Sequence, residues 1–255
     1  MPQELLVDAH DRVMRITINR EERRNAMNPD VVNAIGDALD RAQTDSDIRA
    51  IVLTGAGTKA FCSGADLQSG KSFQHDHAQP YVPFANLVRK VRQLNTPLVA
   101  RVNGACMAGG IGLLSMCDMA VASEHAIFGL PEVKVGVFPS QVLCVLQHLI
   151  PRRVLNEMCI TGEPITAADA KAIGLVNHVS DDLDGKLAWL LDRILDKSPS
   201  AIRRCLYTMK RIDAMSFEEA AAFAESQIAL TAMTEDAKEG REAFREKRKP
   251  VWTGR

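Results

Sequence analysis

The stretch CMAGGIGLLSMCD, residues 106–118, carries the pattern that decides the fold. Its second half has the apolar spacing of a buried helix, but its first half contains Gly109, Gly110 and Gly112. Each of these glycines lowers helix propensity by about 1 kcal/mol relative to alanine. At the start of a helix, however, glycine lets a ligand reach backbone N–H groups that have no acceptor within the helix. The stretch predicts a site for an anion or an oxyanion, although close helix packing would explain the same glycines.

Strands and helices alternate on the N-terminal side of this stretch. Three segments have the composition of strands and two have helical spacing, namely strands at 12–19, 50–57 and 97–104 and helices at 29–45 and 83–94. This order predicts an α/β core with largely parallel, buried strands. Ligands bind at the carboxyl ends of the strands in such folds. The glycine-rich loop at 54–67 also follows a strand, so we expect it on the same face as residues 106–118.

The composition is that of a globular protein. The chain has 255 residues, 46% of them apolar and 25% charged, and its formal net charge is -1. This length fits one core with a modest appendage. There is no cationic excess that would attract nucleic acid or an anionic membrane. Since no apolar run approaches the roughly 20 residues of a bilayer span, and no cationic segment leads into an apolar one, we expect a cytoplasmic protein.

The cysteines do not suggest a metal or redox site. They are scattered through apolar contexts without the two-residue spacing of zinc or redox motifs, at Cys62, Cys106, Cys117, Cys144, Cys159 and Cys205. We therefore expect reduced core cysteines. The segment QHDH at 74–77 places two histidines beside an aspartate, but this spacing is typical of an exposed polar loop.

The character of the chain changes near residue 199. Amphipathic helices rich in alanine and charge are expected at 200–212, 216–233 and 235–249. This tail is too short for a core of its own, so we expect it to pack on the main domain or on another subunit. The chain is accordingly divided into a core at 1–197 and a C-terminal helical region at 198–255.

A second loop, FCSGADL at 61–67, also places small residues around a glycine after a strand. It could supply a backbone N–H that faces the N–H groups of residues 106–118. Two opposed N–H donors on one carbonyl oxygen form an oxyanion hole. By itself, the loop is more typical of a simple turn.

Taken together, the motifs resemble the enoyl-CoA hydratase/isomerase (crotonase) family over nearly the whole chain. They occur in the family's order: NAMN at 25–28, AFCSGADL at 60–67, VNGACMAGGIGLLSMCDMAVAS at 102–123, FGLPEVKVG at 128–136, TGEPITAADAKAIGLVNHV at 161–179 and EAFREKRKPVWTGR at 242–255. The resemblance implies a crotonase-like spiral of strand-strand-helix turns with a C-terminal helical region used in trimerisation. It also implies a homotrimer or a dimer of trimers.

The resemblance implies that two backbone N–H groups polarise the thioester carbonyl of an acyl-CoA and stabilise an enolate. By motif position, the donors are Ala65 and Gly109. The positions that match CoA-lining residues are the backbone at Arg23 and Arg24 and, within segment 63–68, Ser63, Asp66, Leu67 and Gln68. Phe244 and Lys247 match positions that approach CoA from a neighbouring chain. Without the resemblance, Arg23, Arg24 and Lys247 would be read as solvated surface charges. CoA is part of the substrate, and no metal or redox cofactor is implied.

Glu132 matches the catalytic glutamate of hydratases and isomerases. It follows a rigid proline between apolar residues in FGLPEVKVG. A lone glutamate is usually a surface charge, but proton transfer beside a thioester needs a carboxylate in a partly dry site. We therefore expect Glu132 to be the principal base and acid. Hydratases of the family carry a second glutamate three positions beyond the oxyanion-hole glycine, where this chain has Gly112.

Three interpretations of Gly112 follow. Glu132 alone could carry a proton between C4 and C2 through a dienolate. Hydration could persist, with Glu132 both activating water and returning the proton, or with help from another group such as Ser140 or Gln141, for which helix capping is the simpler explanation. In the third interpretation, the small residue makes room for a different acyl-CoA.

Glu132 and the oxyanion-hole motifs favour an enzyme, either an enoyl-CoA hydratase (a lyase) or a Δ3-Δ2-enoyl-CoA isomerase. The alternative is a non-catalytic acyl-CoA-binding protein, which Gly112 alone favours. The variable segment at 68–82 is expected to line the acyl pocket.

Overall fold

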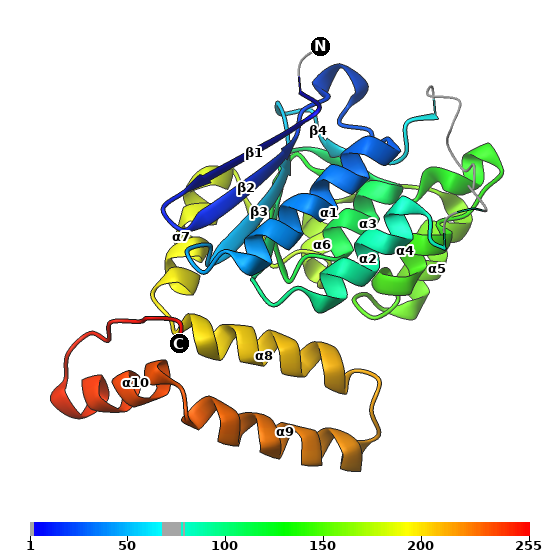
Figure 1. Ribbon diagram of the computed structural model, residues 1–255. Coiled ribbons are helices and arrows are strands. Elements are labelled where there is room, and N and C mark those ends of the chain that lie inside the picture. Colours follow the sequence, from blue (N-terminus) through cyan, green and yellow to red (C-terminus); the bar gives the residue numbers. More distant parts are fainter. Residues whose placement is uncertain (1–2, 68–77, 79) are drawn as a thin grey trace.

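A six-stranded sheet lies at the centre of the computed structural model, which describes residues 3–67, 78 and 80–255 (Figure 1). Its strands follow the order β1 (Leu5–His10), β2 (Val13–Ile18), β3 (Ala50–Gly55), β5 (Leu98–Val102), β7 (Met119–Ser123) and β10 (His178–Ser180). β1 and β2 pair antiparallel, and the other neighbouring pairs are parallel. This confirms the prediction of a largely parallel, buried sheet.

A second, smaller sheet lies beside the first. Its order is β4 (Ala60–Cys62), β6 (Ala105–Met107), β8 (Ile127–Gly129) and β9 (Ile165–Thr166). β3 leads into β4, β5 into β6, and β7 into β8, so each pair joins the two sheets. The helices that follow these pairs are α2 (Pro83–Gln93), α3 (Gly109–Ser115) and α4 (Ser140–Leu146). The repeats of strand, strand and helix form the spiral that the resemblance to the crotonase family implies.

Helices cover both faces of the large sheet. α1 (Pro29–Thr44) begins where the Asn28 side chain accepts a hydrogen bond from the Val31 N–H at 2.8 Å, with Pro29 at the first helical position. α1, α2 and α3 lie on one side of the sheet and α7 (Leu183–Leu195) lies on the other (Figure 1). Further short elements are η1 (Glu21–Arg23), η3 (Pro131–Val135), α5 (Arg152–Thr161) and α6 (Ala167–Ala172).

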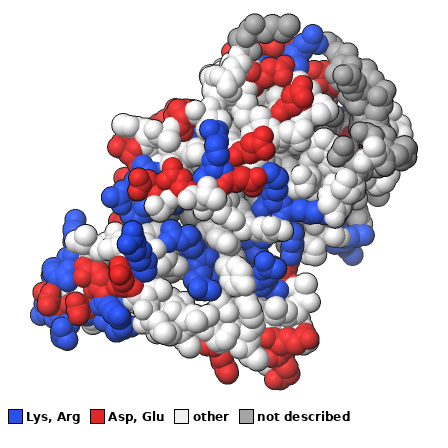
Figure 2. Space-filling view, viewed as in Figure 1, with Lys and Arg blue, Asp and Glu red and all other residues white. Residues whose placement is uncertain are grey.

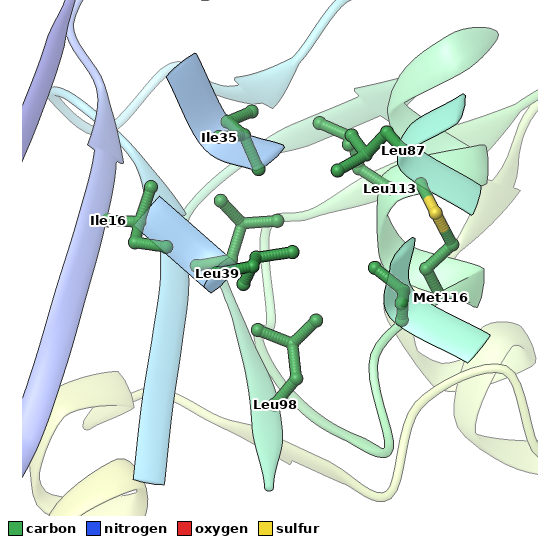
Figure 3. A pocket seen from close by; sticks show the side chains of 9 residues that line it. Ile16, Ile35, Leu39, Leu87, Leu98, Leu113 and Met116 are labelled. Atoms are coloured by element: carbon green, nitrogen blue, oxygen red, sulfur yellow. The ribbon is translucent and has the colours of Figure 1, made fainter. Parts of the chain in front are cut away.

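The main core lies between the sheet and α1, α2 and α3. Figure 3 shows apolar side chains from these elements, among them Ile16, Leu39, Leu87 and Met116, pointing toward a small void. The void measures about 10 Å³ and is lined by carbon and sulfur side chains alone. It has room for at most one water and offers that water no hydrogen bond. The void is therefore a gap in core packing and not a substrate cavity.

The C-terminal part of the described chain is helical, as the sequence predicts. It consists of α8 (Pro199–Ile212), α9 (Phe217–Ala232) and α10 (Glu235–Glu246). Figure 1 shows α8 and α9 side by side, with α8 nearer to the sheet domain. The division of the chain at residue 198 stays a prediction.

Lys210 holds α8 against the core. Its Nζ donates to the carbonyls of Val91 at 3.3 Å and Leu94 at 2.7 Å, at the end of α2. It also lies 3.3 Å from Asp118 Oδ1. Burial raises the pKa of the Asp118 carboxyl, and the nearby Lys210 opposes this shift. One lysine thus ties the helical region to two elements of the core.

Asp236 anchors the end of the chain. Its carboxylate accepts hydrogen bonds from the Ser198 hydroxyl at 2.8 Å, the Ser200 N–H at 3.2 Å, the Thr253 N–H at 2.9 Å and the Gly254 N–H at 3.0 Å. The side chain is buried. Burial raises the pKa of this carboxyl, but the hydrogen bonds together outweigh burial and lower the pKa from 3.8 to about 2.

Asp236→Asn is expected to lower the free energy of unfolding by about 2 kcal/mol at pH 7. Because the folded-state pKa lies below the unfolded value, the contribution of this carboxylate is fully present above pH 3.8 and is lost as the pH falls through about 2. Chemical denaturation of both proteins at several pH values measures the difference. A difference that stays constant down to the lowest pH would contradict this role of the charge.

The expectation that all the cysteines lie in the core is wrong for Cys144 and Cys205, which are exposed. Cys62 and Cys106 are buried, as expected. On α4, Val142 takes the buried face, which leaves Cys144 on the outer one. Cys205 lies on α8, where the described residues of one chain cover only part of the surface. Sequence neighbours that are apolar do not reveal which face of a helix is covered.

Candidate active site

The NAMN and SGAD loops run side by side. The Met27 N–H donates to the Gly64 carbonyl at 2.8 Å, and the Asp66 N–H donates to the Met27 carbonyl at 2.8 Å. In a parallel pair, the residue between two such bonds points its own N–H away from the partner strand. That residue is Ala65, and within the described part of the chain its N–H has no acceptor.

The guanidinium of Arg20 joins these two loops. It is 7% exposed, and it donates to the Ala26 carbonyl at 2.6 Å and to Asp66 Oδ2 at 2.7 Å. The Asp66 carboxylate, 8% exposed, is therefore engaged inside the protein. The resemblance assigns Asp66 to CoA binding, and this role stays a prediction. Sequence analysis missed Arg20, because no local pattern separates it from Arg23 and Arg24.

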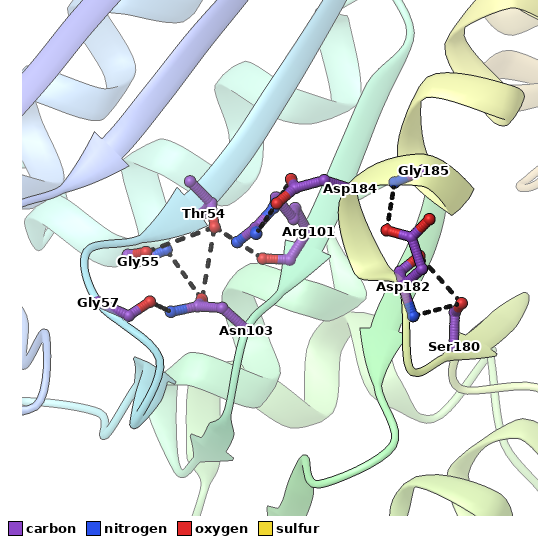
Figure 4. Close-up of polar contacts among 9 residues, drawn as sticks. All are labelled: Thr54, Gly55, Gly57, Arg101, Asn103, Ser180, Asp182, Asp184 and Gly185. Carbon is purple, nitrogen blue, oxygen red and sulfur yellow. Dashed lines mark hydrogen bonds and ion pairs between the residues drawn. The ribbon is translucent and has the colours of Figure 1, made fainter.

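Two asparagines hold the turn between β3 and β4. Asn25 Nδ2 donates to the carbonyls of Ala60 at 2.7 Å and Ala56 at 3.0 Å. Asn103 Nδ2 donates to the same Ala60 carbonyl at 3.1 Å and to the Gly57 carbonyl at 2.7 Å. Figure 4 shows Asn103 reaching from the end of β5 to Gly57. The asparagines of the NAMN and VNG motifs thus position the strand that leads into the SGAD loop.

α3 lies close against β4 and the SGAD loop. A Cβ on Gly110 would lie 2.3 Å from the Cys62 carbonyl oxygen. A Cβ on Gly64, which has φ 97°, would lie 2.7 Å from the Ala108 Cβ. A larger residue at either position would push the helix away. Close packing, one of the two explanations offered for the glycines at 106–118, therefore accounts for Gly110.

Gly109, the first residue of α3, faces Ala65. A Cβ built on Gly109 would lie 3.6 Å from Gly64 Cα and 3.8 Å from the Ala65 nitrogen. Among the residues that the structure describes, the Gly109 N–H has no acceptor either. The preceding Ala108 has φ 51°, a strained conformation for a residue with a side chain and one that is enriched at functional sites. Two neighbouring N–H groups without acceptors can bind an oxyanion.

Glu132 lies in η3, just after β8. Gly129 at the end of β8 pairs with Met107 and accepts a hydrogen bond from the Ala108 N–H at 2.9 Å, so the segment carrying Glu132 starts beside Gly109. Burial raises the pKa of the Glu132 carboxyl. Its Oε2 is buried and has no hydrogen-bond partner among the described residues. A partly dry carboxyl with a raised pKa suits proton transfer near neutral pH.

Gly112, where the resemblance places a second glutamate in hydratases, faces apolar side chains. A Cβ on Gly112 would lie 2.6 Å from Phe84 Cζ and 3.1 Å from Val142 Cγ2. The ring of Phe84 therefore fills the space beside the glycine. This packing speaks against the interpretation that Gly112 makes room for a larger substrate.

Several of the predicted CoA-lining residues gather near the SGAD loop. Arg23 and Arg24 are exposed at the end of η1, and the Ser63 hydroxyl donates to the Arg23 carbonyl at 3.4 Å. Leu67 is 55% exposed. Gln68 lies outside the described residues.

Phe244 and Lys247 do not join this group within one chain. Phe244 lies on α10, where it is 88% exposed, and Lys247 ends that helix. Figure 1 shows α10 at the opposite end of the molecule from β4. Within one chain, these two residues therefore lie away from the candidate site.

The remaining candidates have no role in the described site. The residue that precedes the first turn of α4 is Pro139, which makes no side-chain capping hydrogen bond, and Ser140 lies inside the helix, so the capping role expected for Ser140 is wrong. No group of three His, Cys, Asp or Glu side chains within residues 3–67, 78 and 80–255 could hold a metal ion. The QHDH segment lies outside these residues.

None of the described helices is long and apolar enough to cross a membrane.

The chain matches a known protein family over nearly its whole length. A sequence model of the enoyl-CoA hydratase/isomerase family matches residues 8–255. The chain belongs to this family. Its members include enoyl-CoA hydratase EchA19 of Mycobacterium tuberculosis, which is 36% identical over 260 residues, covering 98% of this chain and 96% of that protein.

Other relatives also match over nearly the full length of both chains. The (E)-benzylidenesuccinyl-CoA hydratase of Thauera aromatica is 33% identical over 262 residues, covering 100% of both chains. A crystal structure of an enoyl-CoA hydratase from Mycobacterium smegmatis matches with a TM-score of 0.92 at 33% identity, covering 98% of this chain and 99% of that one. The crotonase-type α/β fold is therefore shared over nearly the whole chain.

Proposed function

We propose that this family member binds an enoyl-CoA and stabilises its thioester enolate between the N–H groups of Ala65 and Gly109, with Glu132 as acid and base. The observation that carries the proposal is the pair of neighbouring N–H groups that have no acceptor among the described residues. Donors that are positioned before the reaction stabilise a developing oxyanion without reorganisation. A protein that only bound acyl-CoA would not need a carboxyl whose pKa is raised by burial, as that of Glu132 is.

With one carboxylate, the site best supports a shift of the double bond. Ionised Glu132 takes a proton from C2 of a 3-enoyl-CoA. The C–H electron pair forms the C1=C2 bond of a dienolate, while the carbonyl π pair moves to the oxygen that both N–H groups bind. As the carbonyl re-forms, the C1=C2 π pair moves to C2=C3, and the C3=C4 π pair takes the proton from Glu132 to form a C–H bond at C4. No water is consumed, and Glu132 is ionised again.

Hydration is the second candidate, and the names of the relatives favour it. Here Glu132 takes a proton from water as the water oxygen adds to C3 of a 2-enoyl-CoA. The resulting enolate is held by the same N–H groups, and Glu132 returns the proton to C2. The product is a 3-hydroxyacyl-CoA.

Proton NMR in heavy water tests the proposal and separates the two reactions. The protein is incubated with a trans-2-enoyl-CoA and, separately, with a 3-enoyl-CoA of the same chain length. Interconversion of the two thioesters without a hydroxy product is the expected result. A 3-hydroxyacyl-CoA formed from the 2-enoyl thioester would establish hydration instead. Binding without any reaction or exchange of Cα protons would leave only the non-catalytic alternative.

The CoA part of the substrate is proposed to lie along Arg23, Arg24 and Ser63. Phe244 and Lys247 would approach it from a neighbouring copy, since one chain keeps them apart from the SGAD loop (Figure 1). No metal or redox cofactor is expected, and a cytoplasmic location stays a prediction of the sequence.

Assembly of copies through the C-terminal helices is part of this proposal. Large apolar side chains are exposed there, namely Met209 at 54%, Phe217 at 81%, Ile228 at 68% and Met233 at 73%. Figure 2 shows a mostly uncharged surface along α9. A homotrimer or a dimer of trimers would bury these side chains, and light scattering measures the mass of the assembly.

Arg20 and Asp66 are proposed to position the Ala65 N–H. Arg20→Lys keeps the charge but cannot bridge two acceptors in the same plane. We expect Arg20→Lys and Asp66→Asn each to lower kcat by about tenfold with little change in KM, and the double variant to be no worse than the worse single variant. If Asp66 bound CoA instead, Asp66→Asn would raise KM, and Arg20→Lys would not.

A further inference from the structure

We propose that Phe84 determines which reaction the site performs, because its ring occupies the space in which a second acid would act on water. The inference rests on the proposed function and concerns its reaction specificity. Phe84 would make the site selective for 3-enoyl thioesters, whose double bond moves without the addition of water.

The position of Gly112 connects Phe84 to the reaction. Residues three apart lie on the same side of a helix, so Gly112 follows Gly109 along one face of α3. A Cβ on Gly112 would lie 2.6 Å from Phe84 Cζ and 3.2 Å from Phe84 Cε1. Val142 of α4 closes the space from another side, with its Cγ2 at 3.1 Å. Side chains from two other helices thus approach Gly112, on the helix that bears the Gly109 donor.

The ring of Phe84 is held in this place by its own helix. α2 begins at Pro83, and Phe84 is its second residue. Leu87 and Val91 of the same helix are buried in the main core and fix its orientation. Phe84 is partly buried and packs against that core. An aromatic ring has few rotamers, so it fills the space more permanently than a flexible side chain would.

This packing has a chemical consequence. Adding water to C3 is faster when a second group orients the water while Glu132 removes its proton. Apolar carbon atoms beside Gly112 cannot hold a water by hydrogen bonds. Glu132, whose Oε2 has no partner among the described residues, is then left to move a proton between two carbons of the substrate.

Four proteins test the inference: the wild type, Gly112→Glu, Phe84→Ala/Gly112→Glu and the control Phe84→Ala/Gly112→Gln. For each, the rate of hydration of a 2-enoyl-CoA is divided by the rate of isomerisation of a 3-enoyl-CoA. Gly112→Glu alone should lose both activities, since the new side chain overlaps the ring. Phe84→Ala/Gly112→Glu should raise the ratio by about tenfold or more, because a positioned acid or base contributes about 10²–10⁴-fold to a rate. The glutamine control should not raise it.

A core residue without influence on the chemistry would change both rates in parallel and leave the ratio unchanged. An unchanged ratio in a folded double variant therefore overturns the inference, as does a wild type that hydrates faster than it isomerises. If the double variant does not fold, Phe84→Leu/Gly112→Glu withdraws the ring tip with a smaller loss of volume and still supplies the second carboxylate. Its ratio should rise by about threefold or more, and an unchanged ratio would again overturn the inference.

Failure of the inference can be told apart from failure of the proposed function. A wild type that converts neither thioester contradicts the proposed function and the inference together. A wild type that converts both, through Glu132 but with a ratio insensitive to Phe84, contradicts the inference alone.

Discussion

Glu132→Gln is expected to lower kcat by about 10³-fold, while acyl-CoA binds as tightly as to the wild type. Glutamine has the size of glutamate but cannot take a proton from carbon. The groups proposed to bind CoA lie elsewhere, on η1, the SGAD loop and α10. Steady-state rates with 2-enoyl and 3-enoyl thioesters, together with calorimetric binding of a saturated acyl-CoA, measure both effects. Retained turnover would contradict the role of Glu132 as base and acid.

A nearby glutamate provides the matched control. Glu163 is exposed and pairs with Lys134 at 2.7 Å, so Glu163→Gln should leave kcat unchanged. The pH profile adds a second readout. Burial raises the pKa of Glu132 above its ordinary value of 4.5. As the pH falls, the active, ionised form of Glu132 is therefore lost at a pH above 4.5. The acidic limb of kcat/KM should therefore lie above pH 4.5 and should be missing from the residual activity of Glu132→Gln.

Local sequence patterns predict β2, β3, β5, α1, α2 and the C-terminal helices, whereas the spiral arrangement follows only from the resemblance to the family. The helix from Pro29 follows from the cap at Asn28 and from apolar spacing, which are properties of neighbouring residues. Strand β1 was not predicted, because it is an edge strand of which only Leu5 is buried. A strand without a buried face carries no alternation of apolar and polar residues.

The candidate-site residues that lie in sequence motifs could be predicted, whereas those defined by packing between helices could not. Ala65, Gly109 and Glu132 lie in short motifs whose resemblance to the family can be read from sequence. Phe84 could not be found in this way, because its contact with Gly112 depends on how α2 packs against α3. Its neighbours in sequence show an amphipathic helix and say nothing about which residue of another helix the ring touches.

Gly109→Pro is expected to lower kcat by about 10²–10³-fold, the usual effect of removing one oxyanion donor. Proline lacks the backbone N–H, and it is well tolerated at the first position of a helix. Gly109 is that position in α3. The enolate would then be held by the Ala65 N–H alone. Rates measured at saturating enoyl-CoA, beside the thermal midpoint of unfolding, separate a catalytic loss from a loss of stability.

Gly109→Ala is the matched variant, since it adds a side chain and keeps the N–H. Its Cβ would lie 3.0 Å from the Met27 methyl carbon, the free end of a flexible side chain that can move aside. Gly109→Ala should therefore keep most of the activity that Gly109→Pro loses. Equal losses in the two variants would mean that Gly109 is needed for space and not as a donor. A loss confined to the proline variant would assign the effect to a single hydrogen bond, the one on which enolate stabilisation depends in both candidate reactions.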